Sequence, residues 1–267
     1  MHSFEVFFAK TLCWLYKGNS YTCNLCGFNS RIMRWRGRNH SVLKIKKVIS
    51  AGKRRSDCPY CMASDRDRLV WLYISKILSS TGRILHVAPE LPLANAIKKS
   101  PHFKNVEYEC IDKRAKGYFY PNWVKLGDIT KLNYHTNYFD LIIANHVLEH
   151  VHDLPLALSE LKRVLKDNGI AILMVPLSQS HLTDEGCIED NGRVFCPLSK
   201  KVRINRFGQH DHVRLFGIDL ETIFQSNGWQ VSRWCATDHS LDEQNLNLLN
   251  LFPSEKLILA KKNKVST

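Results

Sequence analysis

The segment that decides the fold reads FDLIIANHVLEH at residues 139–150 and LKRVLKDNG at residues 161–169. From Phe139 to Ala144 nearly every side chain is apolar, which predicts a strand buried on both faces of a sheet. The stretch from Pro155 to Leu165 has apolar residues at helical spacing, and we expect this helix to stop at Asn168-Gly169. A second apolar run follows at once and predicts another buried strand.

Helix-like and strand-like segments alternate outward from this segment in both directions. Further strands are expected at residues 83–88, 106–111, 123–127, 170–175, 229–235 and 256–262. Further helices are expected at residues 67–78, 93–99 and 219–225. Apolar strands separated by helices indicate a parallel sheet covered on both faces, and ligands of such sheets bind beyond the carboxyl ends of the strands. The residues at those ends are Ala88-Pro89-Glu90, Asp112, Asp128 and Asn145-His146.

With Gly127-Asp128-Ile129 before it and Phe207 to Arg214 after it, this pattern resembles the class I S-adenosylmethionine-dependent methyltransferases. It is most similar to bacterial methyltransferases often associated with surface-polysaccharide synthesis, a group in which a zinc-ribbon front end also occurs. The resemblance implies an α/β, Rossmann-like sheet of seven strands with an antiparallel last strand. We therefore divide the chain into a small zinc-ribbon-like module at residues 1–67 and a methyltransferase domain at residues 68–267.

A methyl sulfonium cofactor needs acceptors for its ribose hydroxyls and for its adenine amino group. In the register of the resemblance, Asp112 ends the second strand and can accept from both hydroxyls, while Asp128 can accept from the amine. Glu90 is placed to meet the cofactor's ammonium group. The alternatives are ordinary strand-end turn residues and, for Glu90, a surface carboxylate. The expected set for S-adenosyl-L-methionine is Ala88, Glu90, Asp112, Asp128, Ile129 and Asn145.

The first loop, from His86 to Glu90, departs from the family pattern because it contains no glycine. The backbone therefore cannot approach the methionine moiety as freely as a glycine-rich turn can. That would disable a pyrophosphate site, where glycines allow close approach to phosphate oxygens. A methyltransferase is more tolerant, and the polysaccharide-associated relatives resemble this chain here too, so we expect an adapted loop.

Methyl transfer is an in-line displacement in which the enzyme mainly holds the acceptor against the methyl group. A sugar hydroxyl must also lose a proton, and imidazole titrates in the right range for a general base. The candidates are His212 first, then His146, with His150 and Glu149 beside it. The alternative for each histidine is a hydrogen-bonded wall residue. Arg214 could hold an anionic part of the acceptor or form a salt bridge.

Four of the nine cysteines form two Cys-x-x-Cys pairs, Cys23/Cys26 and Cys58/Cys61. An odd total disfavours a disulfide framework and favours metal binding in a reducing, cytoplasmic compartment. Four thiolates would close the shell of a structural Zn²⁺ and fold a segment too small to bury a core. We expect the run from Ser41 to Ile49 to form strand in this module. A redox dithiol is less favoured, since no βαβ pattern surrounds either pair.

The net charge of +13 belongs mainly to the N-terminal part of the chain. Residues 1–70 carry 14 Lys and Arg against 4 Asp and Glu, whereas the rest carries 24 against 21. Such a patch attracts phosphates of nucleic acid, of a nucleotide-linked sugar or of an anionic lipid surface, with a solvated basic face as the alternative. No apolar run approaches the ~18 residues of a transmembrane segment, so only peripheral membrane contact stays open. Apolar side chains between Phe4 and Leu15 predict a docked N-terminal helix.

Three functions compete. The first is O-methylation of a small-molecule or glycan acceptor, such as a sugar, in surface-polysaccharide synthesis. The second is methylation of RNA held by the basic zinc module; against it, Asn145-His146-Val147-Leu148 stands where base-methylating relatives often carry an Asn/Asp-Pro-Pro-aromatic run. The third is a non-catalytic cofactor-binding module, suggested by the glycine-free loop.

Overall fold

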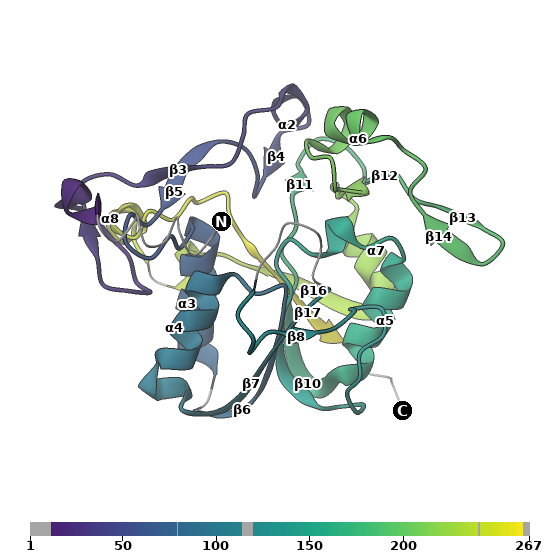
Figure 1. The fold of residues 1–267 in the computed structure, drawn as a ribbon, viewed down its shortest axis with the longest axis horizontal. Helices are drawn as coiled ribbons and strands as arrows, with labels where there is room; N and C mark the ends of the chain where they lie inside the picture. The colour runs from purple at the N-terminus through teal and green to yellow at the C-terminus, as the bar shows by residue number, and fades with distance from the viewer. Residues whose placement is uncertain (1–11, 79, 114–119, 240, 264–267) are drawn as a thin grey trace.

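A computed structural model describes residues 12–78, 80–113, 120–239 and 241–263 of the chain. At its centre lies a seven-stranded sheet in the order β16-β17-β10-β9-β6-β7-β8 (Figure 1). In that order the strands span Trp229–Trp234, Leu257–Lys262, Leu165–Ile172, Phe139–Ile143, Thr81–Val87, Asn105–Asp112 and Lys125–Leu126. All neighbours are parallel except β17, which is antiparallel to both β10 and β16. The expected Rossmann-like sheet with an antiparallel last strand is therefore confirmed.

Helices cover both faces of the sheet and make three layers (Figure 1). One face packs against α3 (Asp65–Ile77), α4 (Leu91–Lys99) and α8 (Glu243–Leu248), and the other against α5 (Leu154–Val164) and α7 (Leu220–Ser226). Successive strand residues point to opposite faces. Ile84 accordingly joins the α3 side of the core, and Leu85 joins the α5 side. Both faces of the strands are thus buried, which is why their apolar runs are continuous.

The N-terminal module is built from pairs of short antiparallel strands. Strand β1 (Lys17–Thr22) pairs with β2 (Asn29–Ser30), and β3 (Arg34–Arg36) pairs with β5 (Arg54–Asp57). Between them, β4 (Val48–Ile49) pairs with β11 (Leu177–Ser178), which follows β10 at the carboxyl edge of the sheet. The module therefore lies along the edge where ligands of parallel sheets bind (Figure 1).

One buried side chain joins this module to the rest of the fold. Arg68 is fully buried on α3, and its guanidinium donates to the carbonyls of Ser56 and Ala63 on the module side. It also donates to the carbonyls of Leu249 and Asn250 near the C-terminus. The expected boundary between residues 67 and 68 falls inside this helix.

A mostly irregular segment connects β10 with α7. It contains β12 (Asp184–Glu185), β13 (Ile188–Asp190), β14 (Arg193–Phe195), α6 (Lys200–Phe207) and β15 (Arg214–Leu215). Strand β12 pairs with β15, and β13 pairs with β14. Short 3-10 turns occur at Cys13–Tyr16, Pro101–Phe103, Leu148–His150 and Ala236–His239. Apart from the turn at Cys13, the helix expected near the N-terminus lies outside the described residues.

The strand expected over residues 41–49 is wrong in its first half. Ser41–Ile45 forms a short helix, α2, and only Val48 and Ile49 are in a strand. Tertiary packing decides this, because α2 buries Val42 and places Leu43 against Gly208, where a Cβ would lie 2.8 Å from the Leu43 Cδ2 atom. A local pattern cannot reveal a partner that is so distant in the sequence.

The expected end of the helix at Asn168-Gly169 is also wrong. Helix α5 ends at Val164, and β10 begins at Leu165. Leu165 is fully buried and pairs with Phe139 of β9, and an irregularity in the pairing follows before Ile170. The Asn-Gly pair therefore lies in an irregular part of a strand, since the burial of Leu165 against β9 outweighs the local helix-stop signal.

Candidate functional site

The loop after β6 compensates for its missing glycine through Ala88. This residue has a φ of +48°, a left-handed conformation that normally favours glycine, and its N–H donates to the carbonyl of Ile111 at 2.7 Å. A left-handed alanine costs about 1 kcal/mol, and such strain persists only where surrounding structure enforces it. The adapted loop expected from the sequence thus has a tight turn at the carboxyl edge.

Glu90 is held by a buried histidine four residues earlier in the chain, His86. Its Oε2 atom lies 2.9 Å from Nε2 of His86, and Nδ1 of His86 lies 2.7 Å from the hydroxyl of Tyr108. Burial alone would raise the pKa of Glu90, but the hydrogen bond and charge of His86 outweigh it and lower the pKa. Glu90 therefore offers a fixed, ionised carboxylate beside the first loop, as an ammonium ligand would require.

The three expected adenosine contacts stand at the ends of β7 and β8. Asp112 is the last residue of β7 and is 9% exposed. Asp128 accepts from the backbone N–H of Thr130 at 2.9 Å and pairs with Lys113 at 2.7 Å, and these bonds outweigh its burial and lower its pKa. Ile129 is buried in the core beside them. Any adenine bound here would share Asp128 with Thr130 and Lys113.

Asn145 follows β9 and is 3% exposed. Neither its Oδ1 nor its Nδ2 atom has a hydrogen-bond partner among the described residues. Buried amides are almost always bonded, so an unpartnered one at the ligand edge fits a polar group supplied by a cofactor or acceptor. The expected S-adenosyl-L-methionine site is consistent with this donor and acceptor set.

The three histidines expected from the sequence gather around Glu149. Glu149 Oε1 lies 3.1 Å from Nδ1 of His146, which adopts a φ of +54°. His150 and His212 stack edge to face with ring centroids 4.7 Å apart. The backbone N–H of Val213 donates to the carbonyl of Glu149 at 2.8 Å, which brings this distant segment to the end of β9.

Burial and mutual contact set the charges of this group. Burial lowers the pKa of His212 to about 4, so its ring is neutral near pH 7. Burial and then the charge of Arg66 lower the pKa of His146. Burial would raise the pKa of Glu149, but the hydrogen bond and charge of His146 lower it to about 2. An ionised Glu149 carboxylate and the neutral ring of His212 therefore lie together in a largely buried part of the site.

Arg214 supports this group rather than facing an open space. It is 1% exposed, pairs with Glu185 at 2.8 Å, and donates to the carbonyls of Leu148 and His152. Of the two roles expected for Arg214, the structure contains the salt bridge. Its bonds hold the turn that carries Glu149.

Arg66 is the contact that sequence reasoning missed. Its guanidinium bonds the His146 ring and donates to the carbonyl of Ser50 at 2.8 Å. The N-terminal module thereby touches the site after β9. No sequence signal could have paired Arg66 with a residue 80 positions away.

The four cysteines of the two Cys-x-x-Cys pairs converge. Their Sγ atoms lie within 4.8 Å of one another, at 3.7 Å for Cys23–Cys61 and for Cys26–Cys58. Four sulfurs about 2.3 Å from a tetrahedral Zn²⁺ would be about 3.8 Å apart, whereas a disulfide needs about 2.05 Å. The set therefore fits a structural zinc and contains no disulfide.

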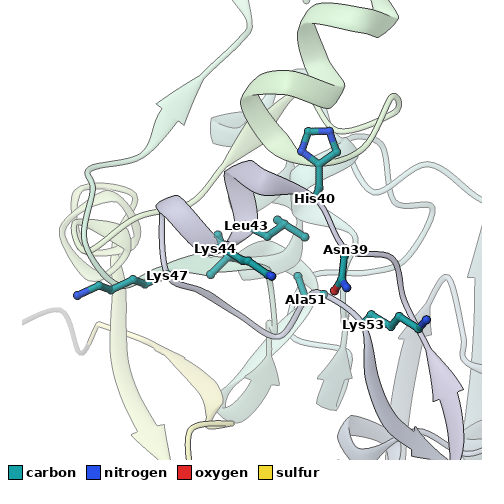
Figure 2. Close-up of a pocket in the computed structure, with 9 residues that line it drawn as sticks. Asn39, His40, Leu43, Lys44, Lys47, Ala51 and Lys53 are labelled. Carbon is teal, nitrogen blue, oxygen red and sulfur yellow. The ribbon is translucent and has the colours of Figure 1, made fainter.

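A cavity of about 310 Å³ opens on the basic part of the module (Figure 2). It is lined by Asn39, His40, Leu43, Lys44, Lys47, Val48, Ala51, Gly52 and Lys53. Figure 2 shows Lys47 and Lys53 extending to opposite sides rather than converging. Three lysines, Lys44, Lys47 and Lys53, line the cavity and make it positively charged. No helix in the described ranges is long and apolar enough to cross a membrane.

The chain is similar to one sequence family and to several solved structures. The sequence profile of a family described as "Methyltransferase domain" matches residues 89–173, from the first loop through β10. No curated protein matches the chain.

Solved structures with a similar fold include the YcgJ protein from Bacillus subtilis, which is 16% identical at a TM-score of 0.42, over 73% of this chain and 98% of that one. A SAM-dependent methyltransferase from Archaeoglobus fulgidus is 18% identical at a TM-score of 0.42, over 72% and 90%. A complex of the Haloferax volcanii Trm112 methyltransferase activator and a methyltransferase contains a chain 11% identical at a TM-score of 0.45, over 74% and 94%. Residues 89–173 thus match a methyltransferase domain, and the central sheet has the strand order of the Rossmann-like class I methyltransferase fold.

Proposed function

We propose that the chain O-methylates a hydroxyl of a small polar acceptor, such as a sugar in surface-polysaccharide synthesis. The observation that carries the proposal is the group of Glu149, His150 and His212, two of them buried, on and against the segment that follows β9 with Asn145. A hydroxyl is a poor nucleophile until it loses its proton, so a site for this reaction needs basic groups near the transferred methyl. The carboxylate and the two imidazoles of this group can each accept a proton.

The cofactor would be held at the carboxyl edge, in our proposal, by Ala88, Glu90, Asp112, Asp128, Ile129 and Asn145. S-adenosyl-L-methionine supplies an electrophilic methyl on a positively charged sulfur. Asp112 would accept from the ribose hydroxyls and Asp128 from the adenine amine, while Glu90 would face the ammonium group. Asn145 would then bond a polar group near the methyl.

His212 is our first candidate for the general base, ahead of His146 and His150. Its burial and its Nδ1 atom, which has no hydrogen-bond partner within the described ranges, support a role beyond packing. His212→Ala should leave S-adenosylhomocysteine affinity nearly intact and slow single-turnover transfer by about 100-fold or more. A wall residue would instead lose stability or acceptor affinity with little loss of rate at saturating acceptor.

The N-terminal module, in this proposal, holds a structural Zn²⁺ through its four paired cysteines, and the protein acts in the cytoplasm. The convergence of the four sulfurs supports the metal. The basic residues of the module suit an acceptor that carries phosphate, such as a nucleotide-linked sugar. RNA is the less favoured partner, and peripheral contact with an anionic membrane fits the same charge.

Transfer of a tritiated methyl group from labelled cofactor tests this function. We expect label in the glycan or nucleotide-sugar fraction of a cell extract, and none with heat-treated protein. Label in RNA would contradict the proposed acceptor class and favour methylation of RNA. Cofactor binding without label in any fraction would contradict catalysis.

A further inference from the structure

Glu149, His150 and His212 form a group with the spacing of a metal site. Each offers one ligand atom, and these atoms lie within 4.8 Å of one another. Three atoms that bind one ion at about 2.0–2.2 Å lie about 2.8–3.6 Å apart in octahedral or tetrahedral geometry. Side-chain rotations that bring these atoms closer by at most about 2 Å would let the group surround an ion.

Two of these side chains have buried polar atoms that nothing in the described part of the chain bonds. They are Oε2 of Glu149, on a residue 1% exposed, and Nδ1 of His212, on a residue 2% exposed. Buried polar atoms are normally satisfied, and leaving one unbonded costs about 1–3 kcal/mol. A carboxylate oxygen and an imidazole nitrogen can both be satisfied by one cation.

Neighbouring groups orient the candidate ligands, as hydrogen bonds to ligand side chains do in metal sites. Nδ1 of His150 lies 3.2 Å from the carbonyl oxygen of Asp211 and 3.6 Å from its carboxylate, which leaves Nε2 as the ligand atom. His146 bonds the other oxygen of Glu149. Histidine ligands usually donate their second N–H to a carboxylate or carbonyl, and this fixes ring orientation and tautomer.

We propose that Glu149, His150 and His212 bind one divalent cation, with the ligand set of two histidines and one carboxylate. Three protein ligands leave positions open, as in sites where a metal activates an oxygen ligand. This role rests on the proposed function: the cation would bind the acceptor hydroxyl and lower its pKa, and the proton would pass to water. The O–CH₃ bond then forms as the C–S bond breaks, giving a methyl ether and S-adenosylhomocysteine. His212 would act as a ligand rather than as the base.

Metal analysis followed by Mn²⁺ titration of the full chain, with its zinc left in place, tests the site. Thiolates select softer ions, so Mn²⁺ should not compete for the cysteine cluster. We expect one ion per chain beyond the cysteine-bound zinc, either present on purification or taken up as Mn²⁺ detected by electron paramagnetic resonance. If the site is filled on purification, the variants should lose that ion.

His150→Ala is the main variant because its side chain is 34% exposed and should be removable without unfolding the protein. Glu149→Gln is the second, since it keeps the shape of the carboxylate. Each should weaken Mn²⁺ binding at least about 10-fold. His135→Ala, at an exposed histidine outside the group, is the matched control and should bind Mn²⁺ as the wild type does.

S-adenosylhomocysteine affinity is measured on the same samples. Two results, each with normal cofactor affinity, would overturn the metal site. One is the absence of an extra ion in the wild type, and the other is equal Mn²⁺ affinity in the wild type and both variants. Either would leave His212 as a base. Absence of cofactor binding with normal Mn²⁺ binding would instead count against the proposed function.

Discussion

Asp112 is the residue on which cofactor affinity should depend most. Its nearly buried carboxylate ends β7, where it can accept from both ribose hydroxyls. Asp112→Ala should weaken S-adenosylhomocysteine binding by about 2 kcal/mol, or about 30-fold, because a bond to a charged group is lost in a partly buried site. Calorimetric titration measures the change.

The matched control is Asp140→Ala, at the second residue of β9, where the carboxylate instead accepts from the N–H of Arg83. This variant should bind S-adenosylhomocysteine as the wild type does. Equal affinity in wild type and Asp112→Ala would show that the ribose is held elsewhere.

At the scale of single residues, the sequence predicts the positions of some site residues but not the contacts of others. Asp112 and Asn145 could be placed because each follows an apolar run, and strand ends of a parallel sheet share one edge. The left-handed conformation of Ala88 could not be predicted. It is set by the hydrogen bond from its N–H to the carbonyl of Ile111 on β7, the strand next to β6. The contact between Arg66 and His146 could not be predicted either, since only the folded chain brings these two residues together.

Among the elements, α2 and α6 meet through a charged junction at Asp184 of β12. Asp184 pairs with Lys46 at 2.7 Å and with Arg206. Burial alone would raise the pKa of Asp184, but its bonds to Arg206 and Lys46 lower it. A lowered pKa in the folded state means that the stabilisation is present above the ordinary value of about 3.9 and is lost as pH falls through the folded value.

Asp184→Asn should therefore lower the free energy of unfolding by about 1 kcal/mol at pH 7, a modest amount because the group is partly exposed. The difference from wild type should shrink steadily below about pH 4. Urea unfolding at several pH values measures it. Asp167→Asn, whose carboxylate is 76% exposed, is the control and should change little. A loss of stability that persists unchanged to acid pH would argue against the ionic junction.

The elements that the pattern of apolar residues predicted best are those whose packing is uniform along their length. Strand β9 is apolar on both faces, so its limits came within a residue of the expected ones. Helix α2 and the start of β10 were misjudged for the opposite reason. Leu43 packs on the loop after α6, and Leu165 pairs with Phe139, so distant contacts decide both boundaries.

At the scale of the whole molecule, zinc should tie the N-terminal module to the sheet. Cys58→Ser should remove about one zinc per chain and lower the melting temperature by at least about 5 °C, because the segment between β5 and α3 would lose its metal anchor beside Arg68. Metal analysis and calorimetry check both. Cys187→Ser, outside the cysteine cluster, is the control. Unchanged zinc content in Cys58→Ser would contradict the metal site.

The central claim is that the carboxyl edge of this sheet binds the methyl-donor cofactor, and isothermal titration of the full chain with S-adenosylhomocysteine tests it most directly. The glycine-free loop after β6 makes the outcome informative, because its turn depends on a left-handed alanine. We predict saturable binding of about one ligand per chain. No saturable heat with ligand up to about 1 mM, where even a 4 kcal/mol interaction would register, would contradict the account.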